Sequence, residues 1–310
     1  MRYLSLFSGS GGAELAMGKV FPEASCVGFS EIDDAAKSAY LQHFPGHKDL
    51  GRVENVGGHA LQPVDIVIGG SPCQGFSLEG SRRGLDDERS GLFWHFVRLL
   101  KETRARYFIL ENVASIPKSD LQLIEEALGC RSVLINSKHF TPQARRRLYW
   151  CNFPMAEARG DGGTVQDILV RSEKRCKWKG IDTEYMRMLC SKLTCPSTFN
   201  QASFGGELVP RTDGKCNAVT CKISQRDIIY DGEKLRYLEC AELEKLQGFP
   251  LDYTARLGET NRRKVLGNAF TVPVLEHCLK SLKDAQQKSQ AAVDVMEDHQ
   301  VMEDYHIEVL

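Results

Sequence analysis

The sequence predicts an α/β protein whose main part is a doubly wound sheet and whose second part is a smaller domain. Through the first half of the chain, apolar runs of strand length alternate with longer stretches whose apolar residues recur at helical spacing. This alternation is typical of βαβ units and of a largely parallel sheet. It stops at about Pro154, where a mixed sequence rich in Gly, Thr, Lys and Cys begins. The 310 residues also exceed what one hydrophobic core usually holds, so we expect a second domain.

Each expected strand is a short apolar run, and the six runs cover residues 2–7, 25–30, 64–70, 106–113, 132–137 and 146–153. Each expected helix has an apolar face, and the helices fall at 11–21, 33–44, 91–104, 119–129, 238–250 and, after a turn, within 261–284. The helix at 238–250 is closed by Gly248 and Pro250, which disfavour its continuation. A further strand at 47–53 is weakly supported, because HKDLGRV is a poor strand sequence.

These elements divide the chain into a large domain at 1–158, a small domain at 159–240, a return segment at 241–283 that completes the large domain, and a tail at 284–310. The tail carries an acidic excess and no clear apolar face. Such a segment cannot bury enough apolar surface to offset the entropy of ordering, so we expect it to be disordered.

Charge and hydropathy restrict the class of protein. A net charge of −1 creates no global field toward nucleic acid or membrane, although a basic face can be hidden in the average. No apolar run reaches the roughly 18 residues that a membrane-spanning helix needs. The N-terminal apolar stretch is too short for a signal peptide. We therefore expect an intracellular protein, in the nucleus if it is eukaryotic and in the cytoplasm if it is bacterial or phage-encoded.

The eleven cysteines are odd in number and irregularly spaced, which favours reduced thiols over a disulfide framework. Two pairs, Cys190 with Cys195 and Cys216 with Cys221, have C-x4-C spacing, whereas zinc ribbons usually have C-x2-C. We therefore favour free thiols at these positions and expect no metal site.

Residues able to do chemistry follow the expected strands of the large domain, where each strand ends. They are the glycine loop FSGSGG at 7–12, Glu31, Asp49, Cys73 and Glu111. Ligands of open parallel sheets bind outside the carboxyl ends of the strands. The sequence therefore predicts that these residues share one edge of the sheet and form a single site.

The glycine loop suits a ligand that contains adenosine. Its glycines let backbone N–H groups approach a ligand closely at a helix N-terminus. Glu31 follows at about the twenty-residue spacing of a carboxylate that binds ribose hydroxyls. Glu14 stands where a dinucleotide-binding loop has its third glycine, so the loop does not demand a pyrophosphate. A plain tight turn remains the alternative interpretation.

Cys73 is either a small packing residue or a nucleophile. It follows Gly69, Gly70 and Pro72 in the sequence GGSPCQGFS, which places it in a rigid loop rather than inside a strand. The carboxylate of Glu111 ends a nearby strand. A thiolate beside a carboxylate is a nucleophile and acid pair, so this position favours chemistry over packing.

Three polar residues of TPQARRRLYW, namely Gln143, Arg145 and Arg147, stand at alternate positions. On a strand these side chains share one face, while Arg146 points the other way. A solvated edge strand is one interpretation. Beside a Cys and a Glu, the three residues favour instead the binding of an anion or a base oxygen.

Taken in order, the motifs FSGSGG, SEID, GGSPCQGFS, LENV, QARRR and GNAFTVPV resemble those of the DNA cytosine C5-methyltransferases. The resemblance runs from residue 1 to about 283 and is weakest at 155–210. VIGGSPC and LQGFPLDYT look most like the animal de novo enzymes, whereas the intact Q-x-R-x-R looks closer to bacterial and phage enzymes. The resemblance implies a Rossmann-like fold that uses S-adenosyl-L-methionine, with the small domain recognising the target.

The resemblance also implies roles for individual residues. Cys73 would add to carbon 6 of cytosine, and Glu111 would bind the ring nitrogen N3 and the exocyclic amine. Arg147 would hold the cytosine oxygen O2, and the further catalytic residues would be Arg145, which braces the site, Asn112, which fixes the Pro-Cys loop, and Gln143. The cofactor would be bound by Phe7, Gly9, Gly11, Gly12, Glu31, Ile32, Asp49, Leu50, Gly70, Pro72, Leu92, Asn268 and Ala269.

The same resemblance implies that the partner is duplex DNA. The target cytosine must then be flipped out of the base stack, and a cleft between the two domains would receive it. The residues expected to contact DNA are Ser77, Arg82, Arg83 and Arg89 in the loop after the nucleophile, with Lys174, Arg175, Lys177 and Arg211 in the small domain. For Lys174, Arg175 and Lys177, a solvated charged face is an equally supported alternative to a DNA contact. A tRNA methyltransferase of the same family and a non-catalytic DNA-binding relative also remain open. The sequence does not reveal the target site.

Overall fold

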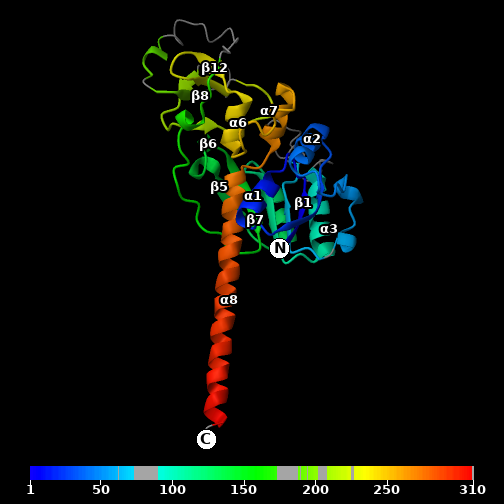
Figure 1. The fold of residues 1–310 in the computed structure, drawn as a ribbon. Helices are drawn as coiled ribbons and strands as arrows, with labels where there is room; N and C mark the ends of the chain where they lie inside the picture. Colours follow the sequence, from blue (N-terminus) through cyan, green and yellow to red (C-terminus); the bar gives the residue numbers. More distant parts are fainter. Residues whose placement is uncertain are drawn as a thin grey trace.

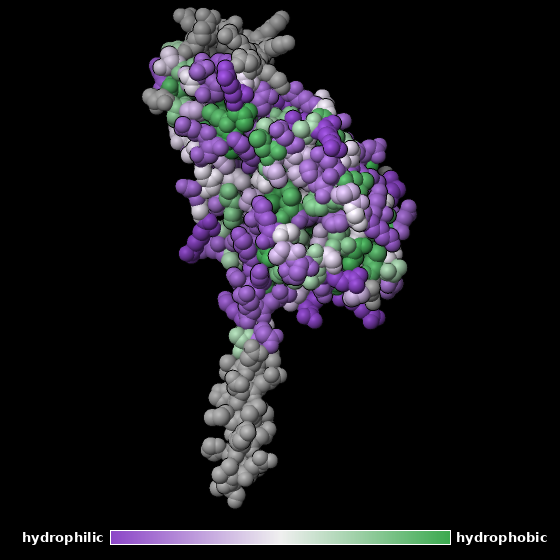
Figure 2. Space-filling view, viewed as in Figure 1, coloured by the Kyte–Doolittle hydropathy of each residue, from purple (hydrophilic) through white to green (hydrophobic). Residues whose placement is uncertain are grey.

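The protein is described here from a computed structural model, which covers residues 1–61, 63–72, 90–172, 188, 190–193, 195–201, 208–224 and 227–308. Two sheets organise these residues, a large mixed sheet in the main body and a smaller one above it (Figure 1). Figure 2 shows polar side chains over most of the visible face, with apolar residues in scattered patches.

The main sheet has the strand order β2-β1-β3-β4-β7-β5. Its strands are β1 (Arg2–Leu6), β2 (Ser25–Ser30), β3 (Ile66–Gly69), β4 (Tyr107–Val113), β5 (Val133–Asn136) and β7 (Arg146–Cys151). The first four pair in parallel, whereas β7 runs antiparallel to both β4 and β5. All six predicted strands are present. The weakly supported strand at 47–53 is reduced to one bridge between Phe29 and Asp49.

The helices are α1 (Gly12–Val20), α2 (Asp34–His43), α3 (Phe93–Thr103), α4 (Lys118–Leu128), α6 (Cys240–Gln247), α7 (Glu259–Asn268) and α8 (Val272–Glu308). α1 and the start of α8 pack on one face of the main sheet, and α3 and α4 pack on the other. Short 3-10 turns lie at Val53–Asn55, Gly58–Leu61, Ser90–Leu92, Ser137–His139 and Val165–Ile168.

Alternation along the strands creates two cores. On β1, Tyr3 faces the core that also holds residues of α1 and α8, while Leu4 and Leu6 face the core formed with α3 and α4. β3 and β4 alternate in the same way. The strands are therefore buried on both faces, as expected of a doubly wound sheet.

The helix ends follow local chemistry. Asp33 caps α2, because its carboxylate accepts a hydrogen bond from the backbone N–H of Ala36. α4 and α6 end at Gly129 and Gly248, whose φ angles of 68° and 76° lie in the left-handed region that glycine adopts most easily. Gly248 is therefore the helix terminus that the sequence predicted.

The smaller sheet has the order β12-β11-β8-β9, with β8 (Ser197–Gln201), β9 (Leu208–Pro210), β11 (Ile228–Tyr230) and β12 (Leu235–Tyr237). A separate parallel pair joins β10 (Cys216–Asn217) to β6 (Gln143–Ala144), so the chain of the small domain returns to the main body at this point. The predicted second, smaller domain is thus present.

One expectation about the C-terminal part is wrong, because residues 261–268 are helical within α7 rather than a turn. The described part of the tail continues α8 to Glu308, and its disorder stays a prediction. α8 projects away from the body (Figure 1). Residues 285–308 contain no Gly or Pro and many strong helix formers, so they propagate the helix that begins in the core. Within the described part of the chain, no helix is long and apolar enough to cross a membrane.

Candidate active site

The loops at the carboxyl ends of β1 and β3 meet β4 and the α7–α8 connection around one small cavity. It is lined by Phe7, Ser8, Gly9, Ser10, Gly12, Gly70, Glu111, Asn268, Ala269 and Phe270. Six predicted cofactor residues and one predicted catalytic residue are in this set. Cys73 follows Pro72 directly along the chain, but it lies outside the described residues.

The glycine loop adopts a conformation that demands glycine. Gly9 and Gly11 have φ angles of 58° and 94°, and Phe7 also has a positive φ of 54°. A Cβ atom on Gly11 would lie 2.7 Å from the Phe44 ring and 2.9 Å from the Tyr253 hydroxyl oxygen. Glycine at position 11 is therefore required by the close packing of Phe44 and Tyr253, while Gly9 and Gly12 leave the cavity wall without side chains.

Glu31 ties the loop after β1 to the loop after β2. Its Oε2 accepts a hydrogen bond from the Gly9 N–H at 2.8 Å, and its Oε1 accepts from the N–H groups of Ile32 at 2.7 Å and Asp33 at 2.8 Å. Ile32 itself is 55% exposed, which leaves its side chain free to cover one face of a ligand ring. Neither Glu31 nor Ile32 lines the small cavity.

Asp49 and Leu50 lie beside β2. Asp49 forms an ion pair with Lys37 at 2.9 Å and accepts a hydrogen bond from the Gly51 N–H. Leu50 donates its N–H to the Phe29 carbonyl. These two residues, with Pro72 and Leu92, do not line the cavity, so their predicted cofactor contacts stay a prediction.

Glu111 and Arg147 form an ion pair across neighbouring antiparallel strands. Arg147 Nε lies 3.0 Å from Glu111 Oε1, and the two side chains are 19% and 14% exposed. A Cβ atom added to Gly70 would lie 3.2 Å from Glu111 Oε2, so Gly70 leaves the second carboxylate oxygen accessible from the cavity. The arrangement presents one acceptor and one cation side by side.

Arg145 and Gln143 serve a different purpose from Arg147. Arg145 is 5% exposed, and its guanidinium donates hydrogen bonds to the carbonyls of Val219, Gly267 and Ala269. Gln143 is fully buried and donates to the Leu246 carbonyl. The prediction that Gln143, Arg145 and Arg147 together bind an anion or a base oxygen is therefore wrong for Gln143 and Arg145. Their donors hold backbone carbonyls of other segments in place.

The alternation predicted for this stretch is nevertheless observed. Arg146 is exposed, whereas its neighbours on both sides are buried or half-buried.

Asn112, also a predicted catalytic residue, donates from Nδ2 to the Ser71 carbonyl at 3.3 Å and to the Ser71 hydroxyl at 3.2 Å. This contact links β4 to the start of the loop that carries Pro72.

Most predicted DNA contacts fall outside the described residues, namely Ser77, Arg82, Arg83, Arg89, Lys174, Arg175 and Lys177. Arg211 is described, and its side chain is 14% exposed. It forms an ion pair with Asp213 and a hydrogen bond with Asn217 at 3.1 Å. Because these internal partners hold the guanidinium, a phosphate contact by Arg211 is not supported.

Sequence reasoning missed two features of the cavity. Phe270 is 7% exposed, and its ring lies 2.9 Å from where a Cβ of Gly70 would be, so the ring packs against Gly70 in the wall of the cavity. Ser10 has a buried hydroxyl without a hydrogen-bond partner among the described residues. The signal for Phe270 was its position directly after Asn268 and Ala269 in GNAFTVPV.

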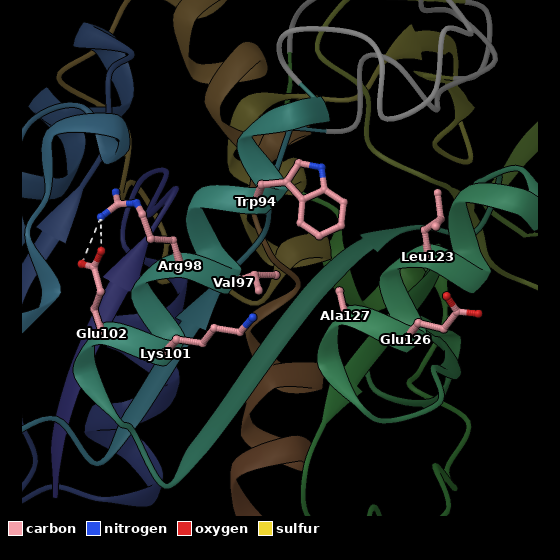
Figure 3. A pocket seen from close by; sticks show the side chains of 8 residues that line it. All are labelled: Trp94, Val97, Arg98, Lys101, Glu102, Leu123, Glu126 and Ala127. Atoms are coloured by element: carbon pink, nitrogen blue, oxygen red, sulfur yellow. Dashed lines mark hydrogen bonds and ion pairs between the residues drawn. The ribbon is translucent and has the colours of Figure 1, made fainter.

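A second hollow lies elsewhere, between α3 and α4 (Figure 3). This groove of about 650 Å³ is lined by apolar side chains of Trp94, Val97, Leu123 and Ala127 and by charged residues that include the Arg98–Glu102 ion pair. It contains none of the motif residues. Across the described ranges, no cluster of three or more His, Cys, Asp or Glu residues could hold a metal ion.

Comparison with known proteins gives one family. A model of the C-5 cytosine-specific DNA methylases matches residues 1–159 and 162–284. The orphan methyltransferase M.Rho11sI of Bacillus phage rho11s is 36% identical over 193 residues, which cover 57% of this chain and 38% of that relative. The type II methyltransferase M.HpaII of Haemophilus parainfluenzae is 28% identical, with 88% of this chain and 87% of the relative covered. The chain thus spans less than two fifths of the phage relatives it matches.

Solved structures support the fold. A protein described as a DNA modification methyltransferase of an E. coli prophage aligns with a TM-score of 0.66 at 20% identity, covering 93% of this chain and 99% of its own. The DNMT2 protein of Spodoptera frugiperda aligns with a TM-score of 0.64 at 19% identity, covering 91% and 99%. These similarities confirm the predicted fold class.

Proposed function

The chain belongs to the C-5 cytosine-specific DNA methylase family, and we propose that it transfers a methyl group from S-adenosyl-L-methionine to carbon 5 of cytosine in duplex DNA. The observation that carries this proposal is the Glu111–Arg147 ion pair beside the glycine-loop cavity. One edge of cytosine offers an amine that donates to a carboxylate oxygen and a ring nitrogen that can share a proton with a carboxyl group, and the adjacent carbonyl oxygen suits a guanidinium. The pair therefore matches the base on which the family acts.

The residues around the cavity fit an adenosine-containing cofactor. Gly9 and Gly12 line the cavity without side chains, and the Ser10 hydroxyl is buried with no hydrogen-bond partner among the described residues. When bound, S-adenosyl-L-methionine supplies an electrophilic methyl group on sulfur. Glu31 is the candidate for its ribose, Ile32 for one face of its adenine, and Asn268 for closing the pocket.

Carbon 5 of cytosine is a poor nucleophile, so the reaction needs covalent help from the protein. We assign this step to the Cys73 thiolate, which adds to carbon 6 and makes carbon 5 electron-rich enough to take the methyl group. The Asn112–Ser71 contact supports the assignment, because it anchors the loop that leads to Cys73. Loss of the proton from carbon 5 and expulsion of the thiolate would then restore the aromatic ring.

Glu111 and Arg147 would stabilise the base as charge develops. Addition at carbon 6 raises the basicity of the ring nitrogen N3, so a proton shared with Glu111 lowers the barrier. Arg147 keeps the carboxylate oriented through its 3.0 Å contact and would reach the cytosine oxygen O2. The target atoms are hidden within a duplex, so the base must be flipped out to reach this pair.

The test is methyl transfer from labelled S-adenosyl-L-methionine to unmethylated duplex DNA and, in parallel, to total tRNA, with a base-resolution readout of the DNA. Label at carbon 5 of cytosine in DNA supports the proposal and reveals the recognition sequence. Label in tRNA alone would keep the chemistry and overturn the substrate. Absence of label in both from folded, cofactor-binding protein would favour a non-catalytic relative.

The covalent step is tested with duplex DNA that contains 5-fluorocytosine, because fluorine at carbon 5 blocks the final elimination. We expect a protein–DNA adduct that survives denaturing electrophoresis, and none from Cys73→Ala. Cys195→Ala is the matched control, because this thiol is exposed and belongs to the small domain. An adduct of normal yield from Cys73→Ala would refute the assigned nucleophile.

A further inference from the structure

A buried carboxylate lies directly behind the glycine loop and has no part in the chemistry above. Glu14, the third residue of α1, is 3% exposed. Its Oε1 accepts a hydrogen bond from the Tyr40 hydroxyl at 2.9 Å, and its Oε2 has no hydrogen-bond partner among the described residues. A buried carboxylate with one oxygen unpaired lowers the stability of the fold, so its position directly after a binding loop calls for a functional explanation.

Tyr40 connects Glu14 to the surface. Its hydroxyl oxygen lies 2.9 Å from Nδ1 of His47, which is half-buried. Because the Tyr40 proton is donated to Glu14, the tautomer of His47 that fits this chain has its proton on Nδ1. Burial lowers the pKa of His47 and raises that of Tyr40, so both remain neutral near pH 7. Burial raises the pKa of Glu14 to about 7.

Among the described residues, the elements packed around Glu14 bring no opposite charge against it. The titratable or polar groups that face it are Tyr3 and Ser5 from β1, Cys26 from β2, Tyr40 from α2 and Tyr253 from the segment after α6. α8 also packs along α1, but its Glu276 and Lys283 pair with Lys19 and the Val20 carbonyl, toward the other end of that helix. Ionised Glu14 therefore presents a buried negative charge that a cationic ligand would offset.

The same cluster supports the glycine loop from behind. The Tyr253 hydroxyl donates to the Ser10 carbonyl at 2.7 Å, and His43 stacks on the Tyr253 ring with centroids 3.7 Å apart. Gly11 packs against the Phe44 ring, and Phe44 in turn contacts Tyr40 at a centroid distance of 5.3 Å. Glu14 stands two residues after Gly12, which lines the cavity, so its charge lies in the first turn of the helix that follows the loop.

We propose that Glu14 is a positioning residue through which the cofactor site distinguishes the positively charged sulfonium of S-adenosyl-L-methionine from the neutral thioether of S-adenosyl-L-homocysteine. The inference rests on the proposed function, because it takes this cofactor pair as the ligands. The two ligands share their amino, carboxyl and adenosine groups and differ in the charge on sulfur. A negative charge held in a low-dielectric region beside the loop favours the cation and leaves the neutral product unaffected.

The experiment measures the Kd of each ligand by calorimetry between pH 5.5 and 8.5, and takes the ratio of product Kd to cofactor Kd. Because the shared groups cancel in this ratio, we expect it to rise by about three- to tenfold as Glu14 ionises. Glu14→Gln should hold the ratio at its low-pH value throughout. Glu23→Gln, the same change at an exposed position, should behave as the wild type.

A flat ratio in the wild-type protein would overturn the inference while leaving the proposed function intact. So would a Glu14→Gln protein that loses affinity for both ligands equally, since that is the signature of a purely structural role. Failure of the wild-type protein to bind either ligand would refute the proposed cofactor and the inference together. Tyr40→Phe removes the hydrogen bond to Glu14 and should move the rise of the ratio to higher pH.

Discussion

Replacing Arg145 with methionine should destabilise the protein far more than the same replacement at Arg147, although the two arginines stand two positions apart. The Arg145 side chain is 5% exposed and donates to three backbone carbonyls, those of Val219, Gly267 and Ala269. Methionine fills much of the same volume but donates no hydrogen bond. Two of these carbonyls lie at the end of α7 and the third lies at Val219, so loss of the hydrogen bonds loosens the packing between these two segments.

The magnitude follows from the number of bonds and from burial. A hydrogen bond to a charged group contributes about 1.5–3 kcal/mol, and a buried partner left unsatisfied adds to the loss. Partial relaxation and entry of water reduce the sum, so we expect Arg145→Met to lower the free energy of unfolding by about 3–5 kcal/mol. Arg147→Met removes one ion pair at a half-buried position and should cost about 1 kcal/mol.

The assay is urea denaturation followed by circular dichroism, with cofactor binding and methyl transfer measured on the same preparations. Arg147→Met should remain folded and bind cofactor while losing methyl transfer. Arg145→Met should unfold at a lower urea concentration and lose both activities together. Equal stability of the two variants would show that the hydrogen bonds of Arg145 to the return segment do not hold the site together.

Gly11→Ala should abolish cofactor binding, because φ is 94° and its Cβ would lie 2.7 Å from the Phe44 ring; unchanged affinity in calorimetry would contradict this geometry. Arg236→Met should lower the free energy of unfolding by about 3–5 kcal/mol, because it leaves the buried carboxylate of Glu242 unpaired. Urea titration measures this loss, and the double variant with Glu242→Leu should recover part of it. The buried Glu14, with a pKa raised to about 7, keeps its proton where the unfolded chain has lost it. The free energy of unfolding should therefore fall by about 3 kcal/mol as pH rises from 4.5 to 7, and Glu14→Gln should remove this slope.

The parts of the site that the sequence predicts depend on local spacing. The glycine loop, Glu31 and Glu111 each follow a run of apolar residues that can be read as a strand, and parallel strands bring their carboxyl ends to one edge. Gly9 and Gly11 adopt positive φ angles, which glycine allows without steric strain. These features need no knowledge of distant contacts, so the sequence alone determined them.

The remaining features depend on contacts between segments far apart in the chain. Residue spacing places Gln143, Arg145 and Arg147 on one face, but it cannot tell which of them meets Glu111. Only the antiparallel pairing of β7 with β4 brings Arg147 to that carboxylate, and only the return segment supplies the carbonyls that bind Arg145. In the same way, Glu14 became a buried charge because α2 folds Tyr40 over it. The sequence by itself predicted the family and the edge of the sheet at which the candidate site lies, because both depend on local motifs and their spacing. The tertiary structure decided which polar side chains face the site and which hold it together.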